Sequence, residues 1–391
     1  MVGGGGVRAG RKRDAPAALL AAALLSGCTI SHRMQPLDPL EAGTMDGEGI
    51  HAQGNTESKD YPCEARYAGD GRTVSWLGPS RDADRRSLAE WCSTVGPVEF
   101  RPEPSRDLPP LASNSTFTVV TWNVHVGGGD LADFLRAELG YECDAHGTPG
   151  FRQHFVLLAQ EAYRASDAVP VPPKGAPVPG RIAEQPPSSP RLDIARVAER
   201  CGLALFYVPL MRNGEEAGDR GREDRGSAIL STLPLADPVA IELPLEAQRR
   251  VAVLATVTDP GGSPLRVVTV HFDVASNILR VLSTGGSMRV RQNDGLTEAL
   301  DLLDPKRATP IIVAGDLNTW SVRETVIQRM LKTYTESPPP GKENTRGDWP
   351  PDHLFFRGGG GTFELVAGSY RVVEVYHGSD HKARRATFAV R

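Results

Sequence analysis

The chain has 391 residues, of which 40% are hydrophobic and 24% are charged, an ordinary composition for a globular protein. Its 41 glycines and 32 prolines are more than a compact helical protein needs, and they indicate many loops between short strands. The formal net charge of −4 gives no overall attraction for phosphate polymers, so tight non-specific binding of nucleic acid is not indicated.

The first residues have the pattern of an export signal. A basic start, Arg8 to Arg13, precedes an apolar run at 15–25 that is too short to span a bilayer as a mature helix. Residues 25–28 read L-S-G-C, which resembles the bacterial lipobox, where cleavage precedes an acylated cysteine. We therefore predict that a signal peptide, 1–27, is removed and that Cys28 is lipidated. The protein would then be exported and anchored to the membrane of the cell envelope or surface. An ordinary secretory signal is the alternative.

Removal of that signal would make the chain more acidic. The segment carries four basic residues and one acidic residue, Asp14, so the formal charge of −4 would become about −7. Of the five cysteines, four would remain besides a lipidated Cys28, an even number in an oxidising compartment. Cys63 with Cys92 is the preferred pair because both lie in one short segment, and Cys143 with Cys201 then follows by elimination only. No cysteine or histidine spacing indicates zinc.

Two segments separate the signal from the main domain. Residues 28–59 are polar and lack apolar periodicity, which predicts a flexible tether. Residues 60–112 contain the first cysteine pair and a short helical pattern around 87–91. That segment is too small to bury a core of its own, so we expect it to pack on a catalytic domain at 113–391.

From Thr116 onward, short apolar runs alternate with helical patterns, which predicts an α/β or α+β layered domain. Several runs are nearly continuous in β-branched residues, as strands buried on both faces are. The expected strands contain residues 118–121, 155–158, 228–230, 251–254, 267–270 and 311–313. The expected helices are residues 131–139, 194–201, 296–303 and 325–332.

Side chains suited to metal or phosphate chemistry fall at the ends of these strands, which are rigid places from which to aim ligands into a shared crevice. They are Asn123, Glu161, His271, Asp316, Asn318, Asp352, Asp380 and His381. The oxygen ligands suit a hard cation such as Mg²⁺, and the imidazoles suit phosphate contact or proton transfer.

Each position also has an ordinary explanation when it is taken alone. Asn123 could cap a turn, and the Gly-Asp-x-Asn sequence around Asp316 is a common turn. His271 could be a core histidine and Asp352 a surface charge. The Ser-Asp-His sequence at 379–381 could be an Asx-turn. The functional interpretation rests on all of them occurring together in one order.

That order resembles the endonuclease/exonuclease/phosphatase superfamily over roughly residues 115–391. The residues that carry the resemblance are Thr121-Trp122-Asn123, Gln160-Glu161, Val270-His271-Phe272-Asp273, Gly315-Asp316-Leu317-Asn318, Asp352-His353-Leu354-Phe355 and Ser379-Asp380-His381. The resemblance implies a four-layer sandwich, in which two mixed β-sheets pack face to face between flanking helices, with the active site at one end. It also implies hydrolysis of phosphate esters by an activated water.

The resemblance assigns the metal region to three residues. Glu161 would be the principal metal carboxylate, Asn123 would support the metal or the phosphate, and Asp380 would complete the region. The expected metal is Mg²⁺, with Mn²⁺ or Ca²⁺ as alternatives.

The remaining motif residues would act on the water and the phosphate. By resemblance, Asp316 would orient and deprotonate the water, and Asn318 would hold that water or a phosphate oxygen. His381 would contact the phosphoryl group while Asp352 fixes its tautomer. His271 would be a second histidine near the phosphate.

The substrate stays open at this level. A monomeric nuclease outside the cytoplasm, acting on a nucleic acid, is the first hypothesis. A lipid phosphodiesterase of the sphingomyelinase or phospholipase C type, or a phosphomonoesterase, is the alternative, and a silent binding module with the same cleft is the non-enzyme alternative. Arg225, Arg289 and Arg291 are further candidates for phosphate contact, although solvated surface charge is the preferred interpretation of each.

Overall fold

The computed structural model describes residues 33–36, 67–68, 74–144, 150–171, 190–213, 222–274, 286–340, 343–359 and 361–391. The predicted signal peptide, Cys28 and most of the predicted tether lie outside these ranges. Among the helices within them, none combines the length and the apolarity needed to cross a membrane.

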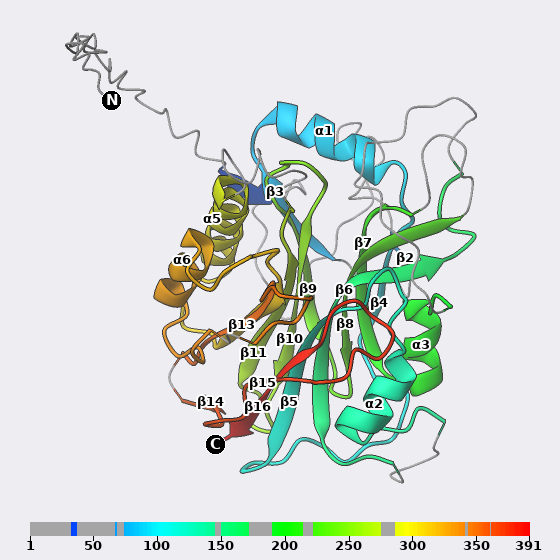
Figure 1. Cartoon of the computed structure of the whole chain (residues 1–391), viewed down its shortest axis with the longest axis vertical. Coiled ribbons are helices and arrows are strands. Elements are labelled where there is room, and N and C mark those ends of the chain that lie inside the picture. The colour runs from blue at the N-terminus through cyan, green and yellow to red at the C-terminus, as the bar shows by residue number, and fades with distance from the viewer. Residues whose placement is uncertain are drawn as a thin grey trace, which may run out of the picture. The chain divides into compact units, whose positions relative to one another are not determined.

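Strands that are far apart in the sequence form two mixed sheets (Figure 1). One sheet has the order β1(Met34–Pro36), β3(Ser75–Pro79), β9(Ala236–Glu242), β10(Val251–Thr258), β11(Pro264–His271), β12(Ile311–Asp316) and β13(Asp352–Arg357). Its β11 and β12 run parallel, whereas β13 runs antiparallel to β12. As a result, one end of this sheet brings together the last residue of β11, the last residue of β12 and the first residue of β13.

The second sheet has the order β14(Phe363–Leu365), β16(Arg384–Val390), β5(Thr116–Asn123), β6(His154–Ala165), β8(Glu223–Ser231), β7(Ala204–Arg212), β4(Val98–Arg101) and β2(Tyr67–Ala68). The short β15(Arg371–Val372) also pairs with β16. Strands β5 and β6 are parallel, and Asn123 at the end of β5 pairs with Gln160 within β6.

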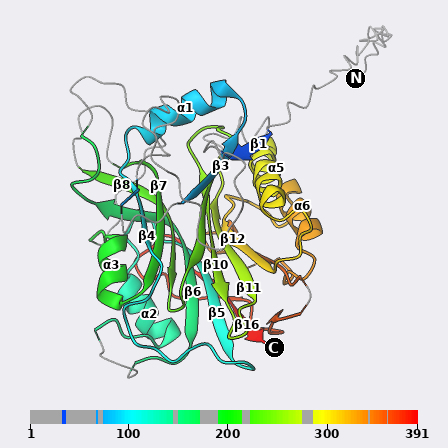
Figure 2. The same ribbon diagram turned by 180° about the vertical axis from the view of Figure 1, so that it is seen from behind.

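The inner faces of the two sheets meet in a core of side chains from both, among them Phe117, Val253 and Phe388. Helices α2(Leu131–Leu139) and α3(Ile194–Cys201) cover the outer face of the second sheet, and α5(Gly286–Leu303) and α6(Thr325–Thr333) cover that of the first (Figure 2). The predicted fold, two mixed sheets packed face to face between helices, is confirmed.

Local signals explain why the sequence patterns located several elements well. The side chain of Asp130 accepts a hydrogen bond from the Asp133 N–H at the start of α2, and Gly140 ends that helix in a left-handed conformation. Both α2 and α3 have the predicted bounds. Helix α5 begins ten residues earlier than the predicted 296–303, because its first turns pack over the end of β11.

The region before residue 113 contributes to both sheets. Strand β3 pairs in parallel with β9, and β4 pairs antiparallel with β7, with α1(Asp82–Cys92) between them in the chain. Strand β1 lies within the predicted tether and pairs with β3, so these three residues belong to the sheet. A disulfide joins Cys143 to Cys201. Cys92 is also disulfide-bonded, and its predicted partner Cys63 lies outside the described residues.

Candidate active site

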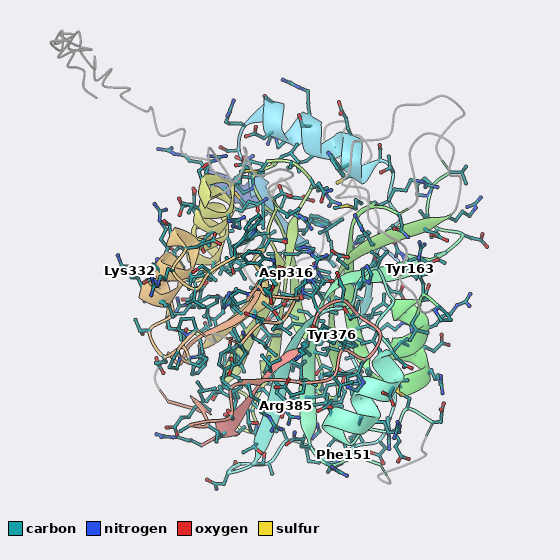
Figure 3. All side chains as sticks on the ribbon, viewed as in Figure 1. Phe151, Tyr163, Asp316, Lys332, Tyr376 and Arg385 are labelled. Atoms are coloured by element: carbon teal, nitrogen blue, oxygen red, sulfur yellow. A yellow bond between two sulfur atoms is a disulfide. The ribbon has the colours of Figure 1, made fainter. Side chains whose placement is uncertain are left out.

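Three strand ends of the first sheet bring His271, Asp316 and Asp352 side by side. His271 ends β11 opposite Asp316, which ends β12, and Asp352 begins β13 opposite Asp316. Gly315 permits the close approach of β12 to β11, since a Cβ at this position would lie 1.8 Å from the Val270 carbonyl oxygen. Asp316, labelled in Figure 3, follows at the end of β12, and its side chain is only 1% exposed.

The second sheet supplies Asn123 and Glu161 to the same place. Asn123 ends β5, and Glu161 lies at a bulge in β6, where the pairing with β8 shifts register. Glu161 has a φ of +54°, a conformation that is unusual for a residue other than glycine and that often marks a functional position. The Asn123 Nδ2 donates to Asp316 Oδ2 at 3.0 Å and to Glu161 Oε1 at 3.4 Å. One amide thus links two carboxylates from different sheets.

His381 lies in the loop before β16 and is held by Asp352. Its Nδ1 is 2.9 Å from Asp352 Oδ2, which also accepts a hydrogen bond from Thr345 Oγ1 at 2.5 Å. Burial disfavours the imidazolium, but the Asp352 charge and this hydrogen bond raise the pKa of His381 to about 9. His381 is therefore a cation at neutral pH, and Asp352 fixes its orientation.

The other nitrogen of that imidazole lacks a hydrogen-bond partner within the part of the chain that the structure describes. His381 Nε2 is buried and makes no hydrogen bond with any described residue. It lies 3.8 Å from Asp316 Oδ2 and 3.9 Å from Asp380 Oδ1. A buried N–H left without a partner is costly, so such groups in native proteins call for an explanation, and a phosphate oxygen would satisfy this one.

His271 has the opposite protonation. Its Nε2 lies 3.6 Å from Asp316 Oδ2 and 3.9 Å from Glu161 Oε1. Burial holds the pKa of His271 well below its usual value, and the positive charges of Arg250 and His381 add to the effect. The site thus contains one neutral and one charged imidazole.

The carboxylates form a cluster suited to a cation. Burial, together with the charge of Asp352, raises the pKa of Asp316 to about 6. Burial would also raise the pKa of Glu161, but the positive charges of Arg225, His381 and Arg250 hold it below the usual value.

Two groups of ligands could hold a metal here. Ligand atoms of Asp316, Asp352 and His381 lie within 4.8 Å of one another. However, a metal at His381 would have to displace a proton whose pKa is raised to about 9, and Asp352 Oδ2 is already engaged by His381 and Thr345. The donor set therefore fits a hard divalent cation best at the oxygens of Glu161 and Asp316.

The remaining predicted residues lie around this centre. The Asn318 N–H donates to Asp316 Oδ1 at 2.7 Å, and its Nδ2 donates to the Phe272 carbonyl at 2.8 Å. Asp380 lies at the rim, where its Oδ2 is 2.7 Å from Arg346 Nη2. Because one of its oxygens is committed to an arginine, Asp380 is a weaker candidate for a metal ligand than Asp316. All eight predicted residues thus occur in one place.

Two of the three arginines expected at the surface are buried instead. Arg289 is 2% exposed and pairs with Glu324, and Arg225 is 5% exposed within β8. Only Arg291, which pairs with Glu246, is half-exposed. Their burial depends on how helix α5 and strand β8 pack in the tertiary structure, which the local sequence does not reveal.

Sequence reasoning missed several supporting residues. Thr345 bonds Asp352, and Ser379 Oγ donates to the Asn123 carbonyl at 2.7 Å while accepting from the His381 N–H at 3.0 Å. Arg250 is held by Asp273 Oδ1 at 3.0 Å. Ser379 and Asp273 are part of the motifs and could have been found there, whereas no sequence signal marks Thr345.

The sandwich and the oxygen-rich, histidine-containing site at one end of it define the class of metal-dependent phosphoester hydrolases. The Endonuclease/Exonuclease/phosphatase family matches residues 120–381, and the chain belongs to this family. The superfamily includes nucleases, phosphatases and sphingomyelinases, and its enzymes use divalent metals. No curated protein matches the chain by sequence.

Solved structures with a similar chain path come from several organisms. An endonuclease/exonuclease/phosphatase from Beutenbergia cavernae is 20% identical, with 70% of this chain and 72% of that chain covered and a TM-score of 0.46. The human Nocturnin catalytic domain with a bound sulfate anion is 16% identical, with 74% and 100% covered and a TM-score of 0.46. Sphingomyelinase C from Streptomyces griseocarneus is 15% identical, with 70% and 99% covered and a TM-score of 0.43.

Proposed function

We propose that this protein is a divalent-metal-dependent phosphodiesterase, and specifically a nuclease that acts outside the cytoplasm. The observation that carries the phosphodiester chemistry is the buried His381 Nε2, which has no hydrogen-bond partner among the described residues and lies 3.8 Å from Asp316 Oδ2. A cationic donor thus lies beside a carboxylate whose pKa is raised to about 6. That arrangement suits a phosphoryl group on one side and an attacking water on the other.

The proposed reaction uses these residues in distinct roles. Asp316 accepts a proton from the attacking water as the new P–O bond forms, and the bond to the leaving oxygen breaks. His381 donates from Nε2 to a phosphate oxygen, and Asp352 keeps its other nitrogen occupied. Asn123 and Asn318 hold the two oxygens of Asp316 in place. A divalent cation bound by Glu161 and Asp316 would supply Lewis-acid stabilisation of the phosphoryl charge and the leaving oxygen.

We expect the purified protein to nick supercoiled plasmid and to cleave single-stranded oligonucleotides in Mg²⁺, with EDTA abolishing both reactions. Excess Mg²⁺ should restore them, because the carboxylate cluster needs its cation. Gel electrophoresis measures both substrates. Sphingomyelin and phosphatidylcholine vesicles and a phosphomonoester serve as parallel substrates.

The parallel substrates decide between the alternatives. Intact nucleic acid together with released lipid headgroup would show a lipid phosphodiesterase, and release of phosphate from the monoester alone would show a phosphomonoesterase. Either result would refute the nuclease. No turnover of any substrate would favour the silent binding module.

The extracytoplasmic location and the membrane partner rest on the sequence at 25–28. We expect mass spectrometry of the protein from its native membrane to find a chain that begins at an acylated Cys28. A Cys28 that is present at the N-terminus but unmodified would indicate an ordinary secretory signal. A chain that retains residues 1–27 would refute export by this route.

A further inference from the structure

Two of the five tryptophans are exposed to solvent and lie beside each other. Trp320 is 37% exposed and Trp349 is 46% exposed, and their ring centroids are 5.1 Å apart at an interplanar angle of 47°. The other three, Trp76, Trp91 and Trp122, are at most 7% exposed. Exposing two adjacent aromatic rings to water costs free energy, and such apolar patches often mark a binding surface.

Both tryptophans are close in sequence to residues of the candidate active site. Trp320 follows Asn318 by two residues, and Trp349 precedes Asp352 by three. Between them, Thr319 Oγ1 donates to the Pro350 carbonyl at 2.9 Å and lies 2.9 Å from His353 Nε2. The two segments that carry the indoles are thus tied to each other at residues adjacent in the chain to Asn318 and Asp352.

The backbone on both sides of the pair is also held. The Trp320 N–H donates to Glu324 Oε1 at 2.5 Å, and the other oxygen of Glu324 is bound by the buried Arg289. The Trp349 N–H donates to the Arg346 carbonyl at 2.9 Å, which closes a tight turn. The rings therefore project from a fixed base, which lowers the entropic cost of binding a flat partner.

The surroundings of the pair are charged rather than apolar. Arg323, Arg346 and Asp348 are all exposed next to the indoles. Arg346 also binds Asp380, which lies 3.9 Å from His381 Nε2. Charged residues near the rings, with an arginine that bonds Trp349 through its backbone and Asp380 through its side chain, suit a phosphate-bearing polymer with flat bases. Insertion into a bilayer would instead favour a continuous apolar surface.

We propose that Trp320 and Trp349 form a stacking platform for a nucleobase next to the phosphate bound at His381. Because base faces are covered by their neighbours in a duplex, the platform would select unpaired, single-stranded nucleic acid. This inference rests on the proposed nuclease function and adds its substrate class.

The test compares a single-stranded oligonucleotide with one of the same length that has abasic sites throughout. The wild-type protein should cleave the base-containing strand with a kcat/KM about tenfold or more above that for the abasic strand, since each aromatic–base stack contributes substantially to binding. Trp320→Ala and Trp349→Ala should lose this preference while cleaving the abasic strand as well as the wild type does. Trp320→Phe should keep it, and Leu302→Ala, which removes an exposed apolar side chain on α5, should change nothing.

The outcomes separate the platform from the proposed function. Equal cleavage of both strands by the wild type would overturn the platform and leave the nuclease in place. A preference that survives in both alanine variants would overturn it too. Hydrolysis of vesicles that depends on the tryptophans, with no cleavage of either strand, would overturn both proposals and assign the pair to a lipid surface.

Discussion

Replacing His381 with alanine is expected to lower kcat/KM for the cleaved phosphodiester by about 10²–10⁴-fold, the range typical of a positioned proton donor or acceptor. The imidazolium is buried, is held at Nδ1 by Asp352 and offers Nε2 to the substrate. Alanine removes that donor and the positive charge together. Steady-state kinetics on a single-stranded oligonucleotide in saturating Mg²⁺ measures the loss.

The pH dependence of the wild-type protein provides a check on the same assignment. Since the pKa of His381 is raised to about 9, the imidazolium persists at neutral pH and is lost as the pH rises through about 9. The kcat/KM should fall over that range, because this ratio reports groups of the free enzyme.

A His381→Ala protein that is folded by circular dichroism and keeps the wild-type rate would contradict the assignment of His381.

Replacing Asp316 with asparagine should also reduce kcat/KM by about 10²–10⁴-fold. The amide has nearly the same shape but cannot take a proton from water, and it supplies less charge to a bound cation. One oxygen of the variant can still accept the Asn318 N–H at 2.7 Å, but its new amide nitrogen faces the Asn123 Nδ2 that donates to Asp316 Oδ2, so circular dichroism must show that the variant is folded.

Asp304→Asn is the matched control for that substitution. Asp304 is a partly buried aspartate that accepts backbone hydrogen bonds from Ala308 and Thr309, away from the site. Its variant should keep the wild-type rate. If Asp316→Asn retained full turnover, Asp316 would be neither base nor metal ligand. If it lost turnover but bound an oligonucleotide as the wild type does, the residue would act on the reaction rather than on binding, as we propose.

The His381→Ala and Asp316→Asn variants also distinguish an enzyme from a binding module. A module that only binds would show no metal-dependent turnover in the wild type, and its binding would not change when Asp316 is replaced by asparagine. The proposed enzyme should show turnover that falls in His381→Ala and in Asp316→Asn while the folding transition of each variant remains cooperative.

Much of the fold follows from local patterns in the chain. Continuous β-branched runs such as 267–270 and 311–313 can be strands buried on both faces, and they became β11 and β12. Helices α2 and α3 were located by their periodicity and have an aspartate at the N-terminus and a glycine at the C-terminus. Strand ends followed by polar residues indicated where ligands would gather.

Other features depend on contacts that no local pattern encodes. The bulge that turns Glu161 toward Asn123 arises from the pairing of β6 with β8, and strands β3 and β4 enter two different sheets from one short segment. Burial of Arg225 and Arg289 depends likewise on the elements packed around them.

The sequence by itself determined which side chains could do phosphoester chemistry, because residue type and order are properties of the chain. Only the tertiary structure decided how they work together. It placed Asn123 between two carboxylates, left His381 Nε2 without a hydrogen-bond partner among the described residues, and brought Trp320 beside Trp349. These relations join residues that are distant in sequence, and their distances and burial exist only after the two sheets have packed.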